Sequence, residues 1–133
     1  MKVRTIILIS IVAGGGDLGT GLMLICTPAG TLALMGVPVV RELVWIQYIG
    51  VFVACVGLSY FAGLISWWNS GSFVRLRTVW ELTVLFRAAI GAFVGIEVLC
   101  GSLQTGWWAV VATDWFWAGL QMVLLRAKFL ELS

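Results

Sequence analysis

Five ionisable residues lie inside long apolar segments of this sequence: Asp17, Glu81, Arg87, Glu97 and Asp114. A charge in a hydrocarbon environment costs from about 2.5 kcal/mol upward, so such side chains normally face protein and find partners. Two aspartates around one arginine leave one carboxylate without a matching positive charge, and this excess would suit a proton or ion relay. The alternative is structural: one aspartate is protonated, and the group joins helices through hydrogen bonds.

Asp17, Arg87 and Asp114 are expected at a similar depth in the membrane, as estimated from the number of residues between each of them and the end of its helix. At a rise of ~1.5 Å per residue, Arg87 lies ~15 Å from the basic ends of the segments, and the two aspartates lie ~18–20 Å from them. A count from the opposite ends separates Arg87 from Asp114 by ~9 Å, which a tilt of the third helix would remove. We therefore predict a buried polar cluster of these three side chains.

Two further polar pairs are predicted at other depths. Glu81 and Gln121 fall at a similar level near the basic ends, and Arg41 could meet Glu97 near the opposite ends. Helical rotation of ~100° per residue also groups small and polar residues on one side of three segments. These inward sides are Ser10, Gly14, Asp17, Thr20 and Gly21; Arg87, Gly91 and Gly95; and Asp114, Trp117, Ala118 and Gln121.

Composition excludes several kinds of active site. The chain has no histidine, which rules out a Ser-His-Asp triad, a bis-histidine haem site and an HExxH zinc site. Its three cysteines form no CxxC pair, and we predict no metal site and no catalytic residue. Gly14, Gly16 and Gly19 match a dinucleotide-binding spacing, but that motif requires a preceding β-strand. No basic surface supports nucleic-acid binding.

Four long apolar segments must position these residues. The 133-residue chain is 62% hydrophobic and 11% charged, compared with roughly 45–50% and 25% in soluble domains. Segments 5–26, 43–66, 77–100 and 106–125 can each cross a hydrocarbon core of ~30 Å as a helix. The predicted fold is therefore all-α, a four-helix transmembrane bundle that forms a single domain over residues 1–133.

Basic residues at the segment ends predict the orientation. Only Arg41 flanks one side, whereas the other side is flanked by Lys2, Arg4, Arg75, Arg77, Arg126 and Lys128. An excess of Lys and Arg marks the cytoplasmic side, so we expect both the N and C termini to be cytoplasmic. Although Ala13-Gly14-Gly15 could pass for a signal-peptidase site, the apolar run continues to Cys26, and we expect the first segment to remain as an anchor. Tryptophan favours interfaces, where we place Trp45, Trp107 and Trp108 outside and Trp67, Trp68 and Trp80 inside.

Small residues and cysteines indicate how the helices pack. Gly15-x3-Gly19 and Gly91-x3-Gly95 have the spacing that lets helix backbones approach in lipid, either within the bundle or against another subunit. Cys26 and Cys100 fall at the outer helix ends, where an oxidising compartment would permit a disulfide. Such cysteines more often act as small apolar packing residues.

The first half of the chain resembles the DoxX-like group of small four-helix bacterial membrane proteins. The residues that carry the resemblance are Leu34-Met35-Gly36-Val37-Pro38, followed by Gln47, Gly50 and Gly57-Leu58 at the spacing of the group's E-x2-G-x6-G-L pattern. Gln47 replaces the common glutamate, so no role of that carboxylate carries over. The resemblance covers about residues 1–66. It implies a bacterial inner membrane and a link to redox or quinone-related complexes.

These features favour a non-catalytic accessory subunit of a larger inner-membrane complex, respiratory or photosynthetic, over an enzyme. The expected partners are other membrane subunits and lipids. The first alternative is a small proton- or ion-linked transporter that uses the predicted cluster. The second is a membrane thiol or quinone redox protein that uses Cys26 and Cys100. We predict no cofactor from this chain alone, but Trp115 and Trp117, which flank Asp114, could contact lipid, a quinone, a pigment or a neighbouring chain.

Overall fold

The computed structural model describes residues 2–130, and within that range the chain is helical and contains no β-strand. Four of its segments are long and apolar enough to cross a membrane, which indicates a multi-pass membrane protein. The elements in order are α1 (Lys2–Cys26), α2 (Pro28–Leu34), α3 (Leu43–Ser70), α4 (Val74–Leu99), the 3-10 turn η1 (Thr105–Trp107) and α5 (Trp108–Arg126).

The four predicted segments are present, with changes at their ends. Helix α3 continues four residues beyond the predicted 43–66, because it ends only where the chain reaches Gly71. Gly71 has a left-handed φ of 70°, and its N–H donates to the carbonyl of Trp67 at 2.7 Å. The stretch after α1 forms the short helix α2, whose first residue is Pro28, a residue suited to that position.

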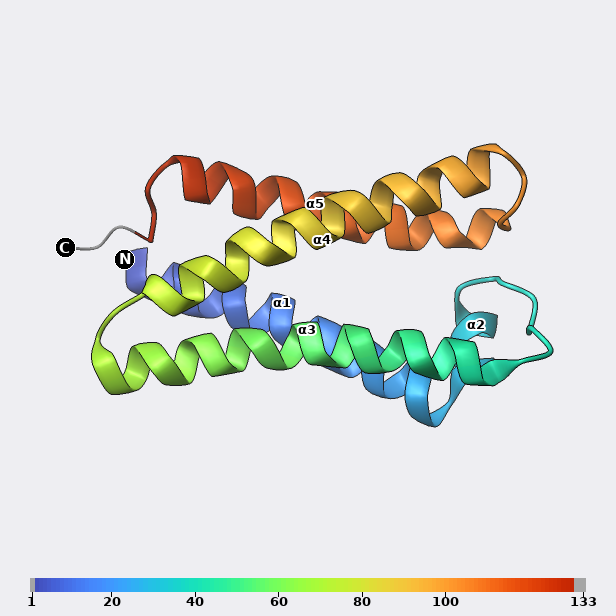
Figure 1. Cartoon of the computed structure of the whole chain (residues 1–133), viewed down its shortest axis with the longest axis horizontal. Helices are drawn as coiled ribbons and strands as arrows, with labels where there is room; N and C mark the ends of the chain where they lie inside the picture. The colour runs from blue at the N-terminus through green and yellow to red at the C-terminus, as the bar shows by residue number, and fades with distance from the viewer. Residues whose placement is uncertain (1, 131–133) are drawn as a thin grey trace.

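The helices form two antiparallel pairs, α1 with α3 and α4 with α5, and α3 also contacts α4 (Figure 1). Helix α1 begins and α5 ends at the end of the bundle that holds the α3–α4 turn, whereas α2 lies at the opposite end (Figure 1). This arrangement places the six basic flanking residues at one end, as the predicted orientation requires. The side of the membrane that this end faces stays a prediction.

Close packing of α1 on α3 depends on glycine. A Cβ atom at Gly14 would lie 2.7 Å from the Cβ atom of Tyr60, and one at Gly21 would lie 2.5 Å from the backbone nitrogen of Ala54. On the facing helix, a Cβ atom at Gly57 would lie 2.6 Å from the carbonyl oxygen of Gly14. Small residues on both helices therefore let the two backbones touch, which is how helices associate in lipid.

Apolar side chains form two buried clusters and also cover the outside. One cluster comprises Ile6, Ala13, Tyr60, Phe73, Leu76, Trp80 and Leu130, and the other comprises Leu24, Leu32, Val37 and Ile46. Along α1, Asp17 lies between these clusters. The outer surface is equally apolar: Leu85, Phe93, Phe116 and Val123 are each more than 60% exposed. Such a surface suits lipid tails, since they are as apolar as the protein interior.

Candidate functional site

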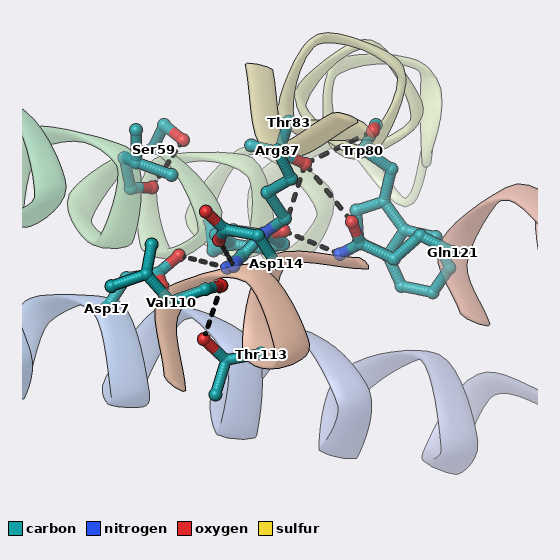
Figure 2. Close-up of polar contacts among 11 residues, drawn as sticks. Asp17, Ser59, Trp80, Thr83, Arg87, Val110, Thr113, Asp114 and Gln121 are labelled. Atoms are coloured by element: carbon teal, nitrogen blue, oxygen red, sulfur yellow. Dashed lines mark hydrogen bonds and ion pairs between the residues drawn. The ribbon is translucent and has the colours of Figure 1, made fainter. Parts of the chain in front are cut away.

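The predicted cluster of Asp17, Arg87 and Asp114 is brought together by three helices (Figure 2). Arg87 extends from α4 and donates through Nη1 to Oδ1 of Asp114 on α5 at 2.8 Å. Its Nη2 donates to Oδ2 of Asp17 on α1 at 2.5 Å. The arginine side chain is only 6% exposed, and those of the aspartates are 16% and 15% exposed. One buried guanidinium therefore joins the α1–α3 pair to the α4–α5 pair.

Glycine also positions the α5 side of this cluster. Gly91 lies one helical turn after Arg87, and a Cβ atom there would overlap the indole of Trp115. Trp115 directly follows Asp114, so the missing side chain at position 91 lets α5 approach α4 where the carboxylate must reach the arginine. Gly95 also faces α5, but a Cβ atom there would lie 3.8 Å from Trp108 and Val111, which is an ordinary contact distance, so the close approach depends on Gly91.

The cluster holds more carboxylate than arginine. Arg87 stays protonated in a protein, so the group is neutral when one aspartate carries the proton and has one negative charge when neither does. Within residues 2–130, the buried Nε of Arg87 has no hydrogen-bond partner. Both carboxyl groups accept from Arg87, so one of them can carry a proton while the other pairs with the guanidinium as its counter-charge, and the Nε–H donor is left for another interaction.

A second buried polar group, formed by Tyr60, Thr83 and Gln121, was not anticipated from the sequence. The amide nitrogen of Gln121 donates to the Tyr60 hydroxyl at 2.5 Å, and that hydroxyl donates to Oγ1 of Thr83 at 2.9 Å. All three side chains are at most 2% exposed. A signal was available, since Tyr60 lies on the same face of α3 as Gly50 and Gly57, but an uncharged hydroxyl is less conspicuous than a charge.

The predicted pair of Glu81 and Gln121 is wrong. Glu81 is half-exposed and accepts a hydrogen bond from Nε of Arg77 at 2.8 Å on the outer side of α4. Gln121 faces the interior of the bundle instead. The two residues lie at a similar depth, but their side chains point in different directions.

The predicted pair of Arg41 and Glu97 is also wrong: no ion pair joins them in the described range. The exposed Arg41 belongs to the non-helical stretch before α3, so a helical depth count does not apply to it.

The two predicted glycine motifs have opposite roles. Gly91 and Gly95 pack within the bundle, as described above. In contrast, a Cβ atom at Gly15 or Gly19 would find no atom within 4 Å, and the same holds for Gly16. The prediction that Gly15-x3-Gly19 packs inside the bundle is therefore wrong. Helix α1 is rotated so that the preceding residue, Gly14, faces α3 instead. Contact of this motif with another subunit stays open.

Two other residues lie elsewhere than predicted. Trp80, expected at an interface, is fully buried, and its Nε1 donates to the Ser10 hydroxyl at 3.1 Å. Thr20, expected on the inner side of α1, is exposed. A depth estimate alone cannot distinguish an interfacial tryptophan from one that turns into the bundle.

No disulfide forms between Cys26 and Cys100, because both, like Cys55, are free and exposed. Cys26 ends α1 and Cys100 follows α4, and these helices belong to different pairs. The thiol redox role considered from the sequence therefore lacks a supporting contact.

No protein-family model, curated protein or solved structure matches this chain. The DoxX-like resemblance accordingly stays a prediction, and a functional assignment must rest on the geometry of the helices.

Proposed function

We propose that this protein is a non-catalytic accessory subunit that packs against a larger inner-membrane complex through the outer side of α1. One observation carries the proposal: Gly15, Gly16 and Gly19 face outward, and no part of the described chain covers them. Glycine inside a helix lowers the stability of the helix by about 1 kcal/mol relative to alanine. Three glycines on the outer side of α1 would therefore destabilise the helix without any gain if that side contacted only lipid. They suit a helix that another backbone approaches closely.

The inner side of α1 shows how a glycine-rich surface packs against another helix. Gly14 and Gly21 on the inner side of α1 hold the backbone of α3 at contact distance. The outer side of α1 also carries glycines, and no residue between 2 and 130 packs against them. The exposed Thr20 adds a hydroxyl that can donate across a helix–helix contact. The resemblance of the first 66 residues supports a bacterial complex of the redox or quinone-linked kind as the partner.

Gentle detergent extraction followed by quantification of co-purifying subunits tests the proposal. Gly15→Ile and Gly19→Ile should each lower the yield of a specific partner, whereas insertion and the apparent melting temperature should stay as in the wild type. Gly119→Ile on α5 is a matched control, since a Cβ atom there also meets no atom within 4 Å. A wild-type protein without a partner in mild detergent, or equal loss in all three variants, would contradict the proposal.

A proton- or ion-linked transporter is the second candidate, and the excess carboxylate around Arg87 is the observation that favours it. Liposomes that contain the purified protein and a pH-sensitive dye would reveal proton flux under an imposed gradient. A transporter should lose this flux in Asp17→Asn or Asp114→Asn. Absence of flux in the wild-type protein would leave the cluster with a structural role only.

A further inference from the structure

A groove runs between the adjoining ends of α3 and α4. The part nearest the turn has a volume of about 440 Å³ and is lined by Ser66, Asn69, Ser70, Ser72, Val74 and Arg75. The part farther along the helices has a volume of about 320 Å³ and is lined by Ser59, Ala62, Gly63, Arg75, Thr78 and Val79. Arg75 lines both parts, so the two parts of the groove adjoin at this residue.

The part of this groove near the turn carries several polar side chains and one positive charge, that of Arg75. Arg75 is exposed and forms no ion pair within residues 2–130. Arg77, two residues later, is paired with Glu81 at 2.8 Å, so the nearby carboxylate does not neutralise Arg75. Asn69 lines the same part of the groove, and its side-chain amide can also donate hydrogen bonds. Together these groups suit a phosphate oxygen, for which arginine is a preferred partner.

Apart from Arg75, the polar side chains that line the part farther from the turn are those of Ser59 and Thr78. Its two hydroxyl groups are satisfied by their own helices: Ser59 donates to the carbonyl of Val56 at 2.6 Å, and Thr78 donates to that of Val74 at 3.1 Å. The remaining wall includes Ala62 and Val79, a shallow apolar surface that suits a hydrocarbon chain. Away from Arg75, the groove thus changes from polar side chains near the turn to apolar ones farther along the helices, in the order of a phospholipid headgroup and its acyl chain.

We propose that this groove binds an anionic phospholipid of the surrounding leaflet, with the phosphate against Arg75 and one acyl chain along Ala62 and Val79. The end of the bundle that holds the groove carries the excess of basic residues and is predicted to be cytoplasmic. Anionic lipids that face basic juxtamembrane residues are attracted by about 1 kcal/mol per charge. The site does not depend on the accessory role of α1, since it lies on other helices.

Native mass spectrometry of the full chain, released from mild detergent, tests the proposal with dioleoyl phosphatidylglycerol and dioleoyl phosphatidylcholine as probes. The wild type should retain one phosphatidylglycerol molecule and much less phosphatidylcholine. Arg75→Gln should lower phosphatidylglycerol affinity about tenfold, the effect of losing one charge-assisted contact. Arg126→Gln is the matched control, because Arg126 is exposed near the same end and does not line the groove. Ala62→Phe, which fills the apolar part without a change of charge, should also weaken binding.

Three results would overturn the proposal. The first is equal retention of the two lipids by the wild type, and the second is an equal loss in Arg75→Gln and Arg126→Gln. The third is complete displacement of phosphatidylglycerol by inorganic phosphate, which would show a free-anion site. Each variant must keep the apparent melting temperature of the wild type, so that weaker binding reports the groove and not the fold.

Discussion

The geometry around Arg87 predicts that the fold tolerates an asparagine in place of either aspartate, but not in place of both. In Asp114→Asn, the amide oxygen can still accept from Nη1 of Arg87, and the ion pair with Asp17 at 2.5 Å remains. Asp17→Asn leaves the complementary pair with Asp114 at 2.8 Å. Each single variant keeps one negative charge beside one positive charge. The double variant leaves the guanidinium buried, 6% exposed, without any counter-charge.

These differences can be expressed as free energies of unfolding. Exchange of a charge-assisted hydrogen bond for a neutral one lowers stability by about 1 kcal/mol. Removal of all counter-charge from a buried ion costs about 3–5 kcal/mol. The double variant should therefore lose about 1–3 kcal/mol more than the sum of the single variants, a coupling typical of residues in one network. At roughly 4 °C per kcal/mol, each single variant should lose about 4 °C and the double variant 12 °C or more in melting temperature.

The assay is thermal unfolding of the purified protein in one detergent, with tryptophan fluorescence as the signal. Glu81→Gln serves as the control, because it makes the same chemical change in the exposed pair with Arg77, where about 0.5 kcal/mol is at stake. If the double variant loses no more than the sum of the single variants, the two carboxylates do not share the arginine, and the account of the cluster is refuted.

Three further predictions follow from other contacts. Tyr60→Phe removes the hydroxyl that accepts from the buried amide of Gln121, and it should lower stability by about 1–3 kcal/mol in the same thermal assay, whereas Tyr48→Phe at an exposed position should have little effect. Gly91→Ile should lower the melting temperature, because the new side chain would overlap an indole on α5; an unchanged value would show that α4 and α5 pack differently. Ser102→Cys, in a variant without native cysteines, should react with an impermeant thiol reagent from outside, and reaction only from the cytoplasm would reverse the predicted orientation.

Much of the helical architecture is encoded locally. An apolar stretch of 20 or more residues is long enough to cross a membrane whatever its neighbours are, so the four spans could be read from hydropathy alone. Their ends were less certain, because capping decides them: α3 continues to Ser70 until a left-handed glycine stops it. The shared depth of Asp17, Arg87 and Asp114 was also accessible, since a helix rises by a constant amount per residue.

The rotation of each helix about its axis was decided only by the tertiary structure. In a soluble protein, polar residues mark the outer side of a helix, but lipid is as apolar as the protein interior, and this contrast disappears. The sequence of α1 therefore allowed either Gly14 or Gly15 to face α3, and it allowed Glu81 to point toward Gln121 or away from it. Contact between glycine backbones placed Gly14 and Gly21 inward, and this choice left Gly15 and Gly19 exposed. Length, depth and charge are properties of one segment, whereas the direction that a side chain faces depends on which backbone can approach it.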